Sequence, residues 1–168
     1  MSTSSNRKYF LFAVVTVVFT VLDQVSKLWV VHTIKGPRMA VPGINLLDKF
    51  GITQEKWVAM PTEIEIIPGF FSFVHTQNPG AAFGIMQGQM FIFAIFTIIA
   101  VFFIGFTLKE MHEDDKFQNI ALALIGSGAI GNAIDRGRLG YVVDFLRLYS
   151  EKNSDLYVWL QANVGMTE

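Results

Sequence analysis

The chain has 168 residues, a formal net charge of -1 and no cysteine, and it is 52% hydrophobic but only 16% charged. Because a typical soluble domain has about 25% charged residues, this composition indicates a membrane protein. The lack of cysteine excludes disulfides, thiolate metal sites and a cysteine nucleophile, and the lack of a basic field argues against a nucleic-acid partner.

Three stretches are apolar for the roughly 17–25 residues that a helix needs to cross a bilayer. We predict spans over about residues 9–32, 90–108 and 117–134 of a single membrane domain, 1–168. Arg7 and Lys8 before the first span predict a cytoplasmic N-terminus. The same start could open a signal peptide, but no small-residue cleavage site follows the apolar run, so an uncleaved anchor is favoured.

The segment between the first two spans, about residues 33–89, is predicted to lie on the outer side of the membrane. Glu63 to Ile66 alternate with period two, as in a half-buried strand, and Phe71 to Thr76 have the composition of a second strand. Pro68-Gly69 marks the turn between them. We therefore predict a small periplasmic β element, preceded over residues 36–61 by an insertion of loop and short helix.

Two charged residues, Asp23 and Lys27, lie near the end of the first span. Charges at this depth are costly and often functional. Their i,i+4 spacing places them on one helix face, where they can pair. The alternative is an ion pair that only tethers the helix end at the interface, with the lysine reaching toward water.

The end of the third span carries a polar stripe. Gly128, Asn132 and Asp135 are spaced i, i+4 and i+7, so they lie within about 60° of each other on a helix. Ser127 and Gly131 form a small-xxx-small pair that lets a neighbouring helix approach closely. The stripe is either the polar wall of a site or a packing seam capped by an acid–arginine pair.

Asp144 follows Asp135 by nine residues, inside the apolar run Tyr141-Val142-Val143-Asp144-Phe145. Apolar surroundings disfavour an ionised carboxylate, which suits a carboxyl that holds or shares a proton. The alternative is one solvated aspartate on a strand or an interfacial turn.

Four stretches together resemble the lipoprotein signal peptidases (signal peptidase II). In chain order they are Asp23-Gln24-Val25-Ser26-Lys27, Asn78-Pro79-Gly80-Ala81-Ala82-Phe83-Gly84, Gly131-Asn132-Ala133-Ile134-Asp135-Arg136 and Tyr141-Val142-Val143-Asp144-Phe145. They look like the family's D-Q-x-x-K, N-x-G-A-A-F, G-N-x-x-D-R and V-x-D-F motifs. Each motif alone is weak, but four in this order with a matching membrane layout are specific.

The resemblance implies an all-α helical bundle of four spans, three of them present here, with a small periplasmic β element. It implies a membrane aspartic endopeptidase of the bacterial inner membrane that removes signal peptides from diacylglyceryl-modified prolipoproteins. The active site would lie near the outer face, where the substrate arrives among membrane lipids, and no metal or other cofactor would be needed.

The resemblance also assigns roles. Asp144 would be one catalytic aspartate, Asn132 and Arg136 would line the site, and Asn78 would bind the substrate backbone or the second acid. The binding or supporting residues, three of which form the polar stripe, are Asn132, Arg136, Asn78, Gly80, Asp23, Lys27, Gly128 and Asp135.

The family's second catalytic aspartate belongs to a W-P-x-F-N-x-A-D motif that opens a fourth span, and the sequence contains neither. Two expectations follow: the sequence is a shortened copy of an active enzyme, or the chain is a non-catalytic membrane protein that binds prolipoprotein. A proton-coupled transporter using Asp23, Asp135 and Asp144 would show inverted repeats or broken helices, and the sequence shows neither.

Overall fold

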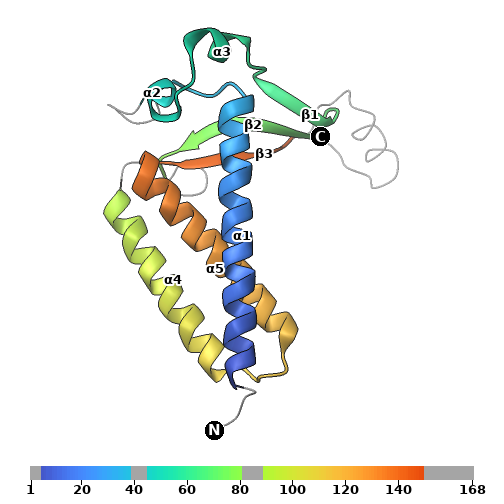
Figure 1. Cartoon of the computed structure of the whole chain (residues 1–168), viewed down its shortest axis with the longest axis vertical. Coiled ribbons are helices and arrows are strands. Elements are labelled where there is room, and N and C mark those ends of the chain that lie inside the picture. The colour runs from blue at the N-terminus through green and yellow to red at the C-terminus, as the bar shows by residue number, and fades with distance from the viewer. Residues whose placement is uncertain (1–4, 39–44, 81–88, 150–168) are drawn as a thin grey trace, which may run out of the picture. The chain divides into compact units, whose positions relative to one another are not determined.

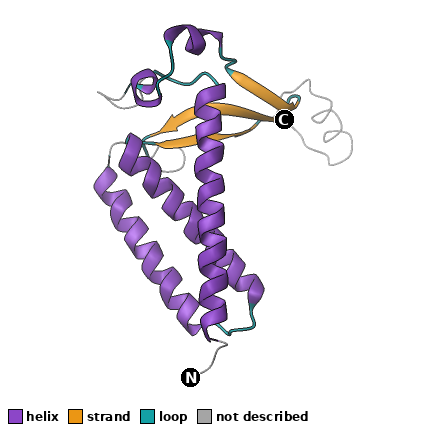
Figure 2. Cartoon of the chain, viewed as in Figure 1, coloured by secondary structure: helices purple, strands orange, loops and turns teal. Residues whose placement is uncertain are grey.

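The structure, a computed structural model, describes residues 5–38, 45–80 and 89–149 (Figure 1). Three long helices, α1 (Ser5–Thr33), α4 (Met90–Glu110) and α5 (Lys116–Leu139), contain most of these residues. Figure 2 shows the helices and strands by colour. The remaining elements are α2 (Leu46–Phe50), α3 (Gln54–Ala59), β1 (Glu63–Ile67), β2 (Phe71–Asn78) and β3 (Val142–Leu148).

The three predicted spans are confirmed as helices that are long and apolar enough to cross a membrane. The qualifying segments are Arg7–Thr33, Phe91–Glu110 and Lys116–Leu139. Large apolar side chains point outward from them: Phe91 is 77% exposed and Phe102 is 69% exposed. So much outward apolar surface fits a lipid environment rather than water.

The chain divides into two compact units. The helical unit contains the residues up to Ser26 and Pro79–Val142, and the sheet unit contains Lys27–Asn78 and the residues from Val143 onward.

In the helical unit, polar side chains tie the start of α1 to the other two helices. Lys8 Nζ donates to the carbonyl oxygens of Lys109 at 3.0 Å and Met111 at 2.9 Å, at the C-terminal end of α4. Asn119 Nδ2, in the first turns of α5, donates to the Lys8 carbonyl at 2.9 Å. A cation at a helix C-terminus also interacts favourably with the helix dipole.

Helix α5 runs further than the predicted span, which stopped at Ile134. It begins after Asp115, whose side chain accepts from the backbone of Gln118, and it ends at Gly140, which has φ 81°. Glycine adopts this left-handed conformation without steric cost. The charged residues after Ile134 therefore do not end the helix, because it carries them into polar contacts described below.

In the sheet unit, the strands follow the order β1-β2-β3. β1 pairs antiparallel with β2, with Ile64 opposite Phe73, and Gly69 in the turn has φ 71°. Tyr149 N donates to Phe70 O at 2.9 Å just beyond β3, so β3 runs antiparallel to β2. The predicted β element is confirmed, and a third strand extends it.

The predicted insertion contains two short helices within its described residues, 36–38 and 45–61. Asn45 caps α2 by accepting from the backbone of Leu47, and Thr53 caps α3 by accepting from Lys56. Such side-chain caps satisfy backbone donors at a helix start. The short helix expected from the sequence is thus confirmed, with a second one beside it in the chain.

Candidate active site

In the sheet unit, the candidate catalytic residue Asp144 is bound to Asn78. Asn78 ends β2 and Asp144 lies near the start of β3, and Asn78 Nδ2 donates to Asp144 Oδ2 at 2.9 Å. Because β2 and β3 are neighbours in the sheet, residues 66 positions apart in the chain come together. The amide fixes one carboxylate oxygen and so orients the whole carboxyl group.

Asp144 is exposed, whereas the preceding Val142 and Val143 are buried. The expectation that Asp144 is enclosed by the apolar run is therefore wrong for the described structure. Side chains alternate along a strand, so Phe145 takes the opposite face, where it packs against Phe73 with ring centroids 6.0 Å apart. An exposed, oriented carboxylate can reach water and a peptide bond.

In the helical unit, the acids of two motifs converge on Gln24. Its Nε2 lies 3.0 Å from Asp23 Oδ2, 3.0 Å from Asp135 Oδ1 and 3.2 Å from Gly131 O. An amide group has two hydrogens, so it shares them among these three acceptors. Asp135 is only 3% exposed, so this amide links a buried carboxyl of α5 to α1.

Gly131 allows this close approach of the two helices. A Cβ at Gly131 would collide with the carboxyl group of Asp23. The small-residue seam predicted from Ser127 and Gly131 is confirmed at Gly131. Ser127 is buried as well, with its hydroxyl donating to Leu124 O at 2.8 Å.

Arg136 makes a second set of contacts in the helical unit. One of its guanidinium nitrogens donates to Gly80 O at 3.1 Å, and the guanidinium lies 4.4 Å from the centroid of the Phe93 ring. Gly80 is buried. Arg136 thus binds the Gly80 carbonyl and stacks on Phe93 of α4. Ala81 to Gly84, which complete that motif, lie outside the described residues.

The predicted polar stripe has two environments. Asp135 is buried, whereas Gly128 and Asn132 are exposed. No described atom lies within 4 Å of a Cβ built on Gly128. The pairing of Asp23 with Lys27 stays a prediction, as does the role of Asn132. Lys27 itself is buried.

Sequence reasoning missed Gln24 as a site residue, although it lies inside the first motif. The available signal was an amide side chain next to an acid within a span, since polar groups in a span are commonly functional. Tyr141, quoted only as part of a motif, is fully buried. Burial, together with the nearby Asp135 charge, raises the pKa of Tyr141 to about 12, so it stays a neutral phenol.

Neither unit offers a metal site in its described part, since no group of three or more His, Asp or Glu side chains is placed to hold an ion there.

Comparison with known proteins agrees with these motifs. Residues 15–164 match the model of the signal peptidase (SPase) II family. The lipoprotein signal peptidase of Maridesulfovibrio salexigens is 40% identical over 147 residues, covering 84% of this chain and 79% of that protein. The lipoprotein signal peptidase of Geobacter metallireducens is 34% identical, covering 84% and 74%.

A solved structure of a bacterial membrane enzyme is also similar, with a TM-score of 0.59 and 28% sequence identity. The match covers 82% of this chain and 73% of that one. The family match extends over most of the chain and includes all four motifs. The chain belongs to the signal peptidase II family.

Proposed function

We propose that the chain is a membrane aspartic endopeptidase that removes signal peptides from diacylglyceryl-modified bacterial prolipoproteins. The observation that carries this proposal is the hydrogen bond from Asn78 to Asp144. It joins two motifs from distant parts of the chain around an exposed carboxylate. The relatives named lipoprotein signal peptidase support the choice of substrate.

Peptide hydrolysis by aspartates requires two carboxyls that share one proton. The ionised carboxyl takes a proton from water, and the protonated one donates to the scissile carbonyl oxygen. Asp144 supplies one of the two, held by Asn78. The family resemblance assigns the other to a W-P-x-F-N-x-A-D motif, and we assign no residue of this sequence to that role.

The proposal extends to the membrane layout. We infer a four-span bundle in the bacterial inner membrane, with a cytoplasmic N-terminus and the site near the outer face. Arg7 and Lys8 at the start of α1 support this orientation, because positive residues favour the cytoplasmic side. The site-lining roles of Asn132 and Arg136 are part of the same proposal.

A second candidate function is a non-catalytic membrane protein that binds prolipoprotein. A single carboxyl cannot carry out the shared-proton mechanism by itself, although it can still bind a substrate backbone.

The test expresses the chain, extended by the family's W-P-x-F-N-x-A-D segment and fourth span, together with a diacylglyceryl prolipoprotein in cells depleted of their own lipoprotein signal peptidase. Immunoblots then measure conversion of the precursor. We expect the wild type to convert it, Asp144→Asn to leave it uncleaved, and Asp48→Asn, a change in an exposed aspartate of α2, to behave as the wild type. The Asn substitution preserves the shape of the side chain and can still accept from Asn78.

Cleavage by Asp144→Asn at the wild-type rate would contradict the assignment of the catalytic aspartate. If the wild type co-purifies with the precursor but does not cleave it, the second candidate function is the correct one. Asn78→Ala is expected to reduce cleavage by about 10–100-fold, since hydrogen bonds to charged groups contribute about 1.5–3 kcal/mol.

A further inference from the structure

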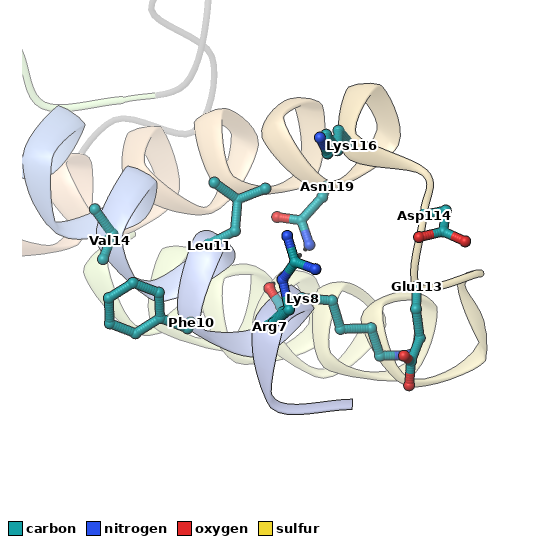
Figure 3. A pocket seen from close by; sticks show the side chains of 9 residues that line it. All are labelled: Arg7, Lys8, Phe10, Leu11, Val14, Glu113, Asp114, Lys116 and Asn119. Carbon is teal, nitrogen blue, oxygen red and sulfur yellow. Dashed lines mark hydrogen bonds between the residues drawn. The ribbon is translucent and has the colours of Figure 1, made fainter. Parts of the chain in front are cut away.

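The helical unit contains a cavity of about 650 Å³ at the N-terminal ends of α1 and α5 (Figure 3). We call it the headgroup cavity. It lies at the opposite ends of these helices from Gln24 and Asp135, so the candidate active site does not account for it. Its lining residues are Arg7, Lys8, Phe10, Leu11, Val14, Glu113, Asp114, Lys116 and Asn119.

The lining changes from apolar to charged across the cavity. Figure 3 shows Phe10, Leu11 and Val14 on one side, and Glu113 and Asp114 on the other. Phe10 is 71% exposed, and it belongs to a candidate membrane span. The apolar side of the cavity therefore faces the region of lipid tails, and the charged side lies where a bilayer places its headgroups. A ligand that fits this gradient is amphiphilic.

The charged side carries both signs. Arg7 and Lys116 supply cations, and Glu113 and Asp114 supply anions. The other cation, Lys8, already donates to two carbonyl oxygens at the end of α4. A headgroup that complements this arrangement has a negative group for the two cations and a positive group for the two acids. A phosphate joined to an amine has this pattern.

The two acids indicate which kind of amine would bind. Glu113 and Asp114 are both exposed, and a carboxylate accepts hydrogen bonds but donates none. A primary ammonium has N–H donors for these oxygens, whereas a trimethylammonium has none. Asn119, which is 1% exposed, does not select the amine, because its Oδ1 points toward Leu11 in Figure 3, on the apolar side of the cavity.

We propose that the headgroup cavity binds a glycerophospholipid that carries a phosphate and a primary ammonium, that is, phosphatidylethanolamine. The phosphate contacts Arg7 and Lys116, and the ammonium contacts Glu113 and Asp114. An acyl chain lies along the apolar side. This site is separate from the proposed peptidase chemistry and does not depend on it.

The test measures lipid binding to the purified full chain in detergent by native mass spectrometry. Phosphatidylethanolamine and phosphatidylcholine with the same acyl chains are compared, because they differ only in the N–H donors. We expect phosphatidylethanolamine to be retained about fivefold more, because only its ammonium can donate hydrogen bonds to the two carboxylates. Equal retention of the two lipids would overturn the proposal.

Two double variants test the two signs of charge. The double variant Glu113→Gln and Asp114→Asn should abolish the preference for phosphatidylethanolamine. The double variant Arg7→Gln and Lys116→Gln should weaken the binding of both lipids. The control is Lys109→Gln with Glu110→Gln, two exposed side chains at the end of α4 that do not line the cavity. It should leave retention unchanged. A preference that survives the loss of both acids, or that falls equally in the control, would refute the assignment.

Two further ligands separate the possible sources of binding. Soluble glycerophosphoethanolamine should bind much more weakly than the lipid, because it lacks the acyl chains that contact the apolar side. Equal binding of the soluble headgroup would refute a lipid site. Tighter binding of phosphatidylglycerol than of phosphatidylethanolamine would show that the cavity selects negative charge alone, and this too would overturn the proposal.

Discussion

Replacing Gly131 by alanine tests how closely α1 and α5 approach each other. A Cβ at Gly131 would collide with the carboxyl of Asp23, so either that side chain or the helix must move. Overpacking costs about 1–3 kcal/mol, and the low end applies here because the atoms met are the end of the Asp23 side chain, which can turn. Movement of Asp23 also disturbs its contact with the Gln24 amide, which bonds Gly131 and Asp135 of α5. Hydrogen bonds between membrane helices contribute about 0.6 kcal/mol on average.

Gly128→Ala is the matched control on the same helix. No described atom lies within 4 Å of a Cβ at Gly128, and alanine is favoured over glycine in a helix by about 1 kcal/mol. Both substitutions gain this favourable helix propensity, but only Gly131→Ala also introduces a steric collision. We therefore expect Gly128→Ala to be neutral or stabilising, and Gly131→Ala to be less stable than it by about 1–2 kcal/mol.

The free energy of unfolding can be measured by titrating sodium dodecyl sulfate into detergent micelles and following unfolding by pulse proteolysis. The Asp23 Cβ lies 3.6 Å from the new Cβ, which is an ordinary contact. Asp23→Ala should therefore relieve the collision, so that the double variant loses less stability than the two single changes together. Equal stability of Gly131→Ala and Gly128→Ala would refute the close approach of α1 and α5.

Three further outcomes follow from contacts elsewhere in the chain. Lys8→Met should lower the free energy of unfolding by about 1–3 kcal/mol, since two carbonyl oxygens lose a charged donor; Lys49→Met, at an exposed position, should not. Burial lowers the pKa of His75 below 6.5, so the unfolded chain binds a proton before the native chain does, and stability should fall as the pH drops from about 7 to about 5. His75→Gln should flatten this profile in the same unfolding assay. Arg147→Gln breaks an exposed ion pair with Glu63, and a change of more than about 1 kcal/mol would contradict its assignment as a weak surface pair.

The elements that the sequence predicted well are those with a strong local pattern. Long apolar runs located the three helices, and alternation at Glu63 to Ile66 located β1. The bond between Asn78 and Asp144 has no local pattern, because the two residues are 66 positions apart. Only the resemblance placed both in one candidate site, and the sheet explains physically why they meet.

The end of α5 shows why the remaining features escaped prediction. Charge after Ile134 was taken to end the span, since an isolated charge in lipid is costly. That cost is reduced when the charge has a partner, and Asp135 has one in the Gln24 amide of another helix. A partner supplied by a distant helix is absent from the local sequence, so the length of α5 and the role of Gln24 had to come from the structure.

The adjacent residues Asp135 and Arg136 show how one helix end can hold two neighbours. Successive side chains on a helix point about 100° apart. Asp135 therefore meets Gln24 of α1, while Arg136 stacks on Phe93 of α4. At the other end of the same helices, the Lys8 side chain donates a hydrogen bond to the end of α4. The Lys8 carbonyl accepts a hydrogen bond from Asn119 of α5.

In lipid the hydrophobic effect does not drive helices together, so packing and polar bonds must do so. The helical unit has such bonds at both ends of its three helices. This arrangement keeps the polar residues of one end in a fixed register with each other. Lys8 takes part in these bonds and also lines the headgroup cavity. Loss of Lys8 should therefore weaken lipid binding as well as stability, whereas loss of the two cavity acids should affect lipid binding alone.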